Sequence, residues 1–211
     1  MYKYLKSTLI IQVDYMNVTN NKDKTSGELL YAIENGDIDR AEKLIEKGAD
    51  VNAKDEFGRT PLMYTGIYRY TDLANVLIEK GADVNAKDNE GRTALMYAVM
   101  NEHAELVKLL IEKGADVNAK DNYGGTPLTY AGIYGYTELA NVLIEKGADV
   151  NAKDKSGRTP LTYAVRNEHA ELVKLLIEKG ADVNATDNDG RTALMFTEMY
   201  GHTELVKWLR M

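Results

Sequence analysis

The chain has 211 residues, no cysteine and a formal net charge of −7 at pH 7. Such an acidic chain is not expected to bind nucleic acid, because that binding needs a basic surface that displaces counterions from phosphates. The lack of cysteine excludes disulfide bonds and cysteine-ligated metals, and no apolar run reaches the roughly 18–20 residues that span a bilayer.

Residues 1–24 form a non-repeat N-terminal arm. Leu5, Leu9 and Val13 stand near helical spacing, so we expect a helix, or else a strand, that docks on the first repeat. Lysines before Leu9 resemble the start of a signal peptide, but the apolar stretch is short and Asp14 interrupts it. We therefore favour a cytoplasmic protein, and we expect residues 20–25 to be a polar linker.

The block Leu-Ile-Glu-Lys-Gly-Ala-Asp-Val-Asn-Ala-Lys-Asp recurs at a step of 33 residues, from Leu44 to a last copy at Leu176 that differs only by Thr186. A fixed period of this size indicates a solenoid, in which each unit contacts only its neighbours. We expect a single repeat domain, 25–211, in which the end units are caps with a solvated outer face. The six units are 25–51, 52–84, 85–117, 118–150, 151–183 and 184–211.

Each full unit carries the same local signals. Residues 55–58, Asp-x-x-Gly, predict a tight turn in which the aspartate bonds nearby main-chain N–H groups. In Thr60-Pro61 the threonine is the expected N-cap of a short helix and the proline its first residue. A second helix is predicted from Thr71 to Lys80, and Gly81 supplies the left-handed residue that ends it.

The end units differ from this pattern. The first unit has no preceding turn, and Thr25 or Ser26 is the expected cap of its first helix. Gly36-Asp37 separates that helix from the next. The last unit stops inside its second helix, where Arg210 occupies a column that is isoleucine in the full units, which suits an outer face.

Two longer motifs recur: Asp-x-x-Gly-x-Thr-Pro-Leu at 55–62, 121–128 and 154–161, and Glu-Leu-Val-Lys-Leu-Leu-Ile-Glu-Lys-Gly-Ala-Asp-Val-Asn-Ala at 105–119 and 171–185. Over about residues 26–211 these motifs resemble the ankyrin repeat. The resemblance implies an all-α solenoid of helix-turn-helix units with short β-hairpin or loop tips, which binds other proteins on a concave face. One departure is consistent, because the histidine that follows Thr-Pro-Leu in the family is replaced here by Met63, Met96, Thr129, Thr162 or Met195.

A second period of 66 residues is superimposed on the first, because residues 60–76 return almost intact at 126–142. Duplication of a two-unit block explains this pattern. In one column of the first helix, glycine (Gly66, Gly132) alternates with valine (Val99, Val165). Glycine inside a helix costs roughly 0.5–1 kcal/mol against alanine, so we expect a small residue to face a large one across each interface.

The resemblance implies that partner contacts come from the tips and from the exposed side of the first helices. The expected tip residues are Phe57, Arg59, Arg92, Tyr123, Arg158 and Arg191. The expected helix residues are Ile67, Tyr68, Met100, Asn101, Ile133, Tyr134, Arg166, Asn167, Met199 and Tyr200.

Two interpretations of these columns stay open. The tyrosines that recur in every second unit form an apolar strip suited to partner binding, or they merely pack on their neighbours. The arginines could grip acidic groups of a partner, but we favour solvated side chains beside the Asp or Glu of their own unit. The three histidines are His103, His169 and His202. They stand too far apart to share a metal ion, so we expect them to stabilise turns.

The sequence therefore predicts a non-catalytic, monomeric scaffold that binds a protein, without cofactor or metal. Catalysis needs groups that converge on one substrate, whereas the acidic residues here repeat along the array, and no Ser/His/Asp set or phosphate loop is present. The alternative is a structural or regulatory module whose groove is filled by its own arm or by a second copy of the chain. Deletion of residues 1–24 and light scattering separate the two.

Overall fold

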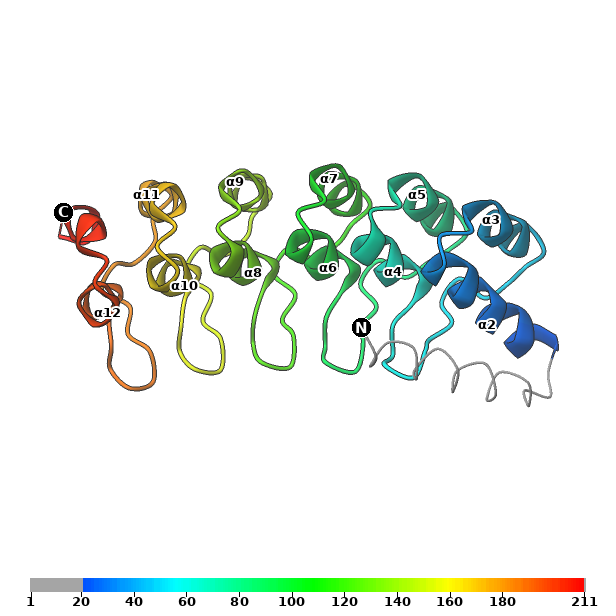
Figure 1. Ribbon diagram of the computed structural model, residues 1–211, viewed down its shortest axis with the longest axis horizontal. Helices are drawn as coiled ribbons and strands as arrows, with labels where there is room; N and C mark the ends of the chain where they lie inside the picture. The colour runs from blue at the N-terminus through cyan, green and yellow to red at the C-terminus, as the bar shows by residue number, and fades with distance from the viewer. Residues whose placement is uncertain (1–20, 211) are drawn as a thin grey trace.

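The computed structural model describes residues 21–210, and the regular structure in that range is helical. The helices form two parallel rows along the long axis of the molecule (Figure 1). One row holds the first helix of each unit: α2 (Asn21–Glu34), α4 (Pro61–Tyr68), α6 (Ala94–Met100), α8 (Pro127–Tyr134), α10 (Pro160–Arg166) and α12 (Ala193–Tyr200). The other holds the second helices: α3 (Ile38–Glu46), α5 (Thr71–Glu79), α7 (Ala104–Glu112), α9 (Thr137–Glu145), α11 (Ala170–Glu178) and α13 (Val206–Leu209), the last preceded by the 3₁₀ turn η2 (Thr203–Leu205).

The expected caps start the first helices. Oγ1 of Thr60 accepts a hydrogen bond from the Met63 N–H at 3.4 Å, and the proline stands at the first helical position. The residue in the place of the missing histidine completes the cap, because the Met63 sulfur accepts from the Thr60 N–H at 3.4 Å. In the third full unit the Thr129 hydroxyl does so from the Thr126 N–H at 3.1 Å. Met63, Thr129 and Thr162 thus replace the imidazole at this junction, whereas Met96 and Met195 make no such bond to the cap.

The loops between units are held by the predicted aspartate turns. Oδ1 of Asp55 accepts from the N–H groups of Phe57 and Arg59, at 2.8 and 2.7 Å. Within residues 21–210 these loops contain no β-strand, only one isolated antiparallel bridge between Thr186 and Thr192. The tips are therefore loops.

Two expectations at the start of the chain are wrong. α2 begins at Asn21, so residues 21–25 belong to a helix and not to a polar linker. Thr25 and Ser26 consequently lie inside the helix and do not cap it. Residues 21–26 contain neither glycine nor proline, so nothing in their backbone chemistry stops the helix. The Ser26 hydroxyl instead accepts from the Asp50 N–H at 3.3 Å. The expected docking of the arm concerns residues 1–20, which lie outside the described range.

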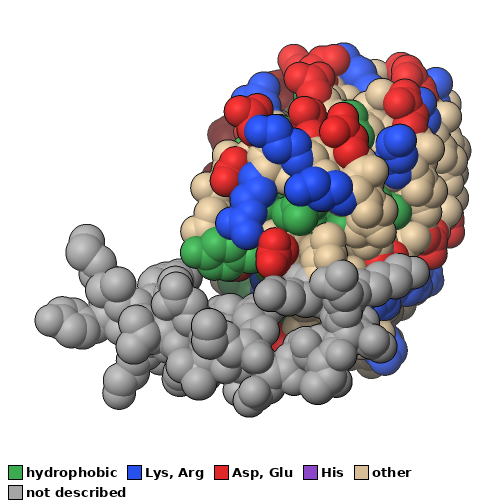
Figure 2. Space-filling model, turned by 90° about the vertical axis from the view of Figure 1, so that its right-hand side faces the viewer, with side chains coloured by type: hydrophobic (Ala, Val, Ile, Leu, Met, Phe, Trp, Pro, Cys, Tyr) green, Lys and Arg blue, Asp and Glu red, His purple; other side chains and the backbone are tan. Residues whose placement is uncertain are grey.

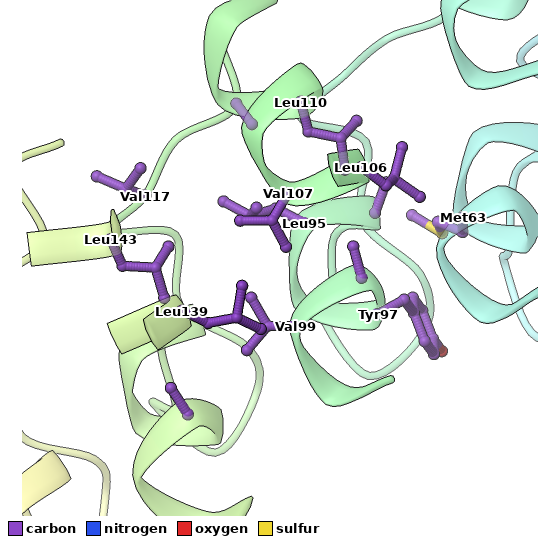
Figure 3. Packing of buried hydrophobic residues seen from close by; sticks show 14 of the residues in the cluster. Met63, Leu95, Tyr97, Val99, Leu106, Val107, Leu110, Val117, Leu139 and Leu143 are labelled. Carbon is purple, nitrogen blue, oxygen red and sulfur yellow. The ribbon is translucent and has the colours of Figure 1, made fainter. Parts of the chain in front are cut away.

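The core runs between the two rows of helices. Leu73 and Leu77 of α5 are buried, as are Leu106 and Leu110 of α7, and full burial of such a side chain contributes about 1.5–3 kcal/mol. Figure 3 shows how side chains of α6 and α7 meet one another and, on one side, Leu139 and Leu143 of α9. Each unit thus completes its core only with its neighbours.

Side-chain amides join neighbouring units at the ends of the second helices. Asn52 donates to the carbonyl of Gly81 at 2.9 Å and accepts from the N–H of Asp83 at 2.7 Å. The same pair of bonds recurs at Asn85, Asn118 and Asn151. Because the main-chain groups that end each second helix would otherwise lack partners, these amides both satisfy the chain and fix the step between units.

Two kinds of junction alternate along the row of first helices. α4 approaches α6, and α8 approaches α10, more closely than α6 approaches α8. A Cβ on Gly66 would lie 2.8 Å from the carbonyl oxygen of Ala94, and one on Gly132 would lie 2.7 Å from that of Pro160. At Gly66 the expected facing of a small and a large residue is found, because the Cβ of Tyr97 lies beside this glycine together with the main chain of Ala94 and Ala98. The nearest atoms to Gly132 are main-chain atoms of Pro160 instead, and at both glycines an added Cβ would crowd the next helix.

The end of the array formed by α2 and α3 differs from its interior. Figure 2 looks onto this end, where acidic and basic side chains are interspersed over the described surface. Arg40 and Glu28 form an exposed ion pair there at 3.3 Å. Such a surface suits the terminal unit of a solenoid, which has no neighbour on one side.

Candidate functional site

The loops and the row of first helices share one side of the molecule, which we call the loop–helix face. In Figure 1 the loops project from the lower row, away from the second helices. Most residues expected to contact a partner belong to these two kinds of element, and Asn101 and Asn167 directly follow the first helices α6 and α10. The face therefore gathers the expected site residues of successive units along the length of the array.

A column of hydrogen bonds joins each aspartate turn to the helix after it. The Tyr64 hydroxyl donates to Oδ2 of Asp55 at 2.8 Å. The pair recurs in the next three units at 2.5–2.6 Å: Tyr97 with Asp88, Tyr130 with Asp121 and Tyr163 with Asp154. These tyrosines were not among the expected site residues, although their recurrence nine positions after each turn aspartate is visible in the sequence.

The last unit lacks this bond because Phe196 stands in the place of the tyrosine. Its turn aspartate, Asp187, is instead paired with Nε of Arg191 at 3.0 Å. Burial opposes ionisation of Asp187, but hydrogen bonds from the Arg191 and Asp189 main chain and from the Arg191 side chain outweigh it, so its pKa is lowered. An ion pair with Arg191 thus takes the place of the tyrosine hydrogen bond to this carboxylate.

Three of the loop arginines lie beside the tyrosine column: Arg59, Arg92 and Arg158. Burial opposes the charge of Arg92, but hydrogen bonds with Tyr130 of the next unit and Tyr97 of its own unit raise its pKa overall. The Arg92 and Arg158 side chains are only 24% and 25% exposed. The expectation of solvated arginines is therefore wrong, because these side chains are half-buried and lie beside tyrosines of their own or the next unit. The expected ion pairs do occur at Arg92, with Glu90, and at Arg191.

The tyrosines of every second unit are exposed and also stacked. Tyr68 is 40%, Tyr134 43% and Tyr200 48% exposed. Their rings lie 5.7–6.2 Å from aromatic rings of their own unit, namely Tyr64 and Tyr70, Tyr136, and Phe196 and His202 respectively. Each ring is thus held in place while one part of it faces solvent, so the two interpretations of this column are compatible.

The other expected residues divide by exposure. Phe57, Tyr123, Met199, Asn101 and Asn167 are exposed. Half-buried positions are Arg59, Arg92, Arg158, Arg191, Ile67, Met100, Ile133 and Arg166. The Arg166 guanidinium lies 5.7–5.8 Å from the ring centroids of Tyr163, Phe196 and Tyr200, so it is surrounded by aromatic rings of this chain.

Histidines and asparagines bind across the junctions between units. Nε2 of His169 lies 3.1 Å from the carbonyl oxygen of Ile133, and the Asn167 amide donates to the same oxygen at 2.8 Å. His103 reaches Ile67 at 3.4 Å, and His202 reaches Arg166 at 3.1 Å. The histidines were expected to stabilise turns. Their acceptors are carbonyl groups near the end of the first helix of the preceding unit, so they also join units.

The described residues were compared with two simple requirements, those of a metal site and those of a membrane span. Within residues 21–210 no three histidine, cysteine, aspartate or glutamate side chains are grouped so as to hold a metal ion. Among the same residues, no helix is both long and apolar enough to cross a membrane.

Comparison with known proteins identifies the repeat. A family model described as "Ankyrin repeats (3 copies)" matches residues 8–88, 29–121, 68–154 and 150–211. No curated protein matches the chain. The matches extend over nearly all of the sequence, and the paired helices and loops agree with them. The chain therefore belongs to the ankyrin repeat family.

Proposed function

We propose that this protein is a non-catalytic scaffold that binds a partner protein on its loop–helix face. Ankyrin repeats generally mediate protein–protein interaction, and proteins built from them are typically not enzymes. The proposal adds the face and the residues that make the contact.

One observation carries the proposal: most exposed large hydrophobic side chains of residues 21–210 belong to the loop–helix face. Eight such side chains are exposed, and the six expected to contact a partner are Phe57, Tyr68, Tyr123, Tyr134, Met199 and Tyr200. Tyrosine and methionine are enriched at protein interfaces, and a tyrosine held by stacking loses little conformational entropy on binding. The stacks described above therefore prepare the rings for contact.

A capture experiment with matched baits tests the proposal. The wild-type chain and a Tyr68→Ala/Tyr134→Ala/Tyr200→Ala variant are immobilised and exposed to the same lysate. Proteins that the wild type retains and the variant loses are then purified. For each, the Kd is measured against a Tyr134→Ala variant. Loss of about 2 kcal/mol or more, a factor of roughly 30, is expected for a central aromatic contact.

The control is a Glu105→Ala/Lys108→Ala variant, because this exposed ion pair lies on α7, in the other row of helices. It should bind like the wild type. Equal retention by the triple variant, or a change below about 0.5 kcal/mol for Tyr134→Ala, would show that these rings only pack on their neighbours.

A further inference from the structure

The arginine column of the loop–helix face is interrupted at one position. Arg59, Arg92, Arg158 and Arg191 follow the turn glycine in four loops, and Gly125 stands at this position in the remaining one. The turn itself is unchanged, because Oδ1 of Asp121 accepts from the Gly125 N–H at 2.8 Å, as Asp55 does from Arg59. One guanidinium is therefore missing from an otherwise intact arrangement.

The loops that carry an arginine show which groups surround its guanidinium. The guanidinium of Arg92 is associated with tyrosines of two successive units, Tyr97 and Tyr130. Nε of Arg158 lies 3.9 Å from Oδ2 of Asp187, the turn aspartate of the next unit. Arg92 and Arg158 thus lie between their own unit and the following one, beside phenol oxygens in the first case and a carboxylate oxygen in the second.

The tyrosines that would flank an arginine at position 125 are present, and they are more exposed to solvent than the tyrosine between Arg59 and Arg92. Tyr97, which lies beside both Arg59 and Arg92, is only 6% exposed. Tyr130, which lies beside Arg92, and Tyr163, which lies beside Arg158, are half-buried. Their hydroxyls donate to Asp121 and Asp154, and Tyr130 is already associated with Arg92 and Tyr163 with Arg158. A phenol oxygen has two lone pairs, so each can accept from one further donor. Within residues 21–210 neither carboxylate has a lysine or arginine nitrogen within 4.0 Å.

The backbone does not require glycine here. Gly125 is not among the residues with positive φ. A Cβ added to it would meet Oδ2 of Asp121 at 3.0 Å, a tight contact, but the same turn carries an arginine in four other loops. The missing side chain therefore reflects the sequence of this unit and not a strained backbone.

We propose that the space beside Gly125 binds the guanidinium group of an arginine from the partner protein. The guanidinium would lie between Tyr130 and Tyr163 and donate to their phenol oxygens and to the carboxylates of Asp121 and Asp154. The partner would complete the arginine column that the chain itself leaves open. This inference rests on the proposed function, because it places one partner side chain on the loop–helix face.

Arginine suits this site better than lysine. Its planar group stacks on aromatic rings and presents several donors at once, whereas an ammonium group is compact and strongly hydrated. The net negative charge of the chain attracts any cation. The experiment must therefore distinguish recognition of the planar guanidinium group from attraction of a positive charge alone.

The test uses small probes and two variants of the full chain. N-acetyl-arginine N-methylamide is titrated while the ring resonances of Tyr130 and Tyr163 are followed by NMR. The lysine and citrulline counterparts of the probe serve as comparisons, since citrulline keeps the shape without the charge. Gly125→Arg supplies the missing side chain from within, and Gly125→Ala adds only the Cβ.

For the wild type we expect shifts at Tyr130 and Tyr163, with the arginine probe binding about three to ten times more tightly than either comparison. Gly125→Arg should abolish these shifts and raise the midpoint of thermal unfolding, and Gly125→Ala should do neither. Equal binding of arginine and citrulline, or a lower midpoint for Gly125→Arg than for Gly125→Ala, would overturn the proposal.

This test and that of the proposed function can fail separately. If the probe binds at Gly125 while the triple tyrosine variant retains every captured protein, the arginine site stands and the proposed aromatic contact fails. If capture depends on the tyrosines but the probe shifts neither ring, the binding face stands and the arginine site fails.

Discussion

The junctions between α4 and α6 and between α6 and α8 join similar units in different ways. In the first, Gly66 lets the main chain of the next helix approach, and His103 adds a bond across the junction. In the second, a buried Val99 occupies the equivalent column, and the helices lie less close together. The close junction recurs between α8 and α10, where Gly132 faces Pro160.

The comparison shows that the period of 66 residues has a structural meaning. A glycine-type unit followed by a valine-type unit forms a closely packed pair, and the pair is repeated. Glycine costs roughly 0.5–1 kcal/mol in a helix, but here it permits contact between two helix backbones that alanine would prevent. The array thus repeats at two levels: every 33 residues as a single unit, and every 66 residues as a closely packed pair of units.

The largest expected effect comes from closing both glycine positions. Gly66→Ala/Gly132→Ala should destabilise the protein by about 2–4 kcal/mol, because each added Cβ meets a main-chain oxygen at 2.7–2.8 Å. That steric cost exceeds the gain in helix propensity. Urea unfolding followed by circular dichroism measures the change.

Val99→Ala is the matched change at the open junction. This substitution also places alanine in the same column of the first helices. It should destabilise the protein by about 2 kcal/mol, because buried methyl groups are lost and a cavity remains. If the double glycine variant were instead stabilised by the helix-propensity amount, the two junctions would not differ in packing and the comparison would be wrong.

Most of the fold could be predicted because its signals are local and repeated. Threonine caps, aspartate turns and left-handed glycines act within a few residues, and each recurs at the same place in every full unit. The start of α2 was missed because polar residues fit a helix as well as a linker, and no breaker separates them.

The functional face was only partly predictable because its contacts cross between units. The exposed tyrosines were found from their column, but the half-buried arginines were taken as solvated, since their cover comes from tyrosines of neighbouring units. The acceptor of each histidine likewise lies 36 residues away along the chain. These contacts between units depend on how the units stack, and the sequence pattern within one unit does not predict that geometry.

A smaller effect is expected at Arg69, where the two close junctions differ. Arg69 and Gly135 both end a first helix with a left-handed residue, at φ 67° and 80°. The ring of His169 packs on Gly135, and its bond to Ile133 is shorter than the bond of His103 to Ile67. Arg69→Gly should stabilise the protein by about 0.5–1 kcal/mol. The substitution relieves the strain of a left-handed arginine in the folded state, and this gain exceeds the cost of the greater conformational entropy of the unfolded chain.

Urea unfolding of Arg69→Gly measures this change, and Arg69→Ala is its control, since alanine shortens the side chain but keeps the strain. If both variants gain equally, the charge or length of Arg69 and not its backbone conformation would explain the difference between the junctions.

The smallest expected effect is a pH dependence at His103. Burial lowers its pKa most, a hydrogen bond to Ile67 acts in the opposite direction, and Arg69 lowers it further. The unfolded chain therefore binds more protons than the folded chain near the ordinary histidine pKa of about 6.5, so stability falls as the pH drops through that value. Solvent screens this partly exposed ring, so the loss should stay below about 0.5 kcal/mol. His103→Gln should flatten the pH profile of unfolding between about pH 7.5 and 5.5, and an unchanged slope would show that the junction does not sense this proton.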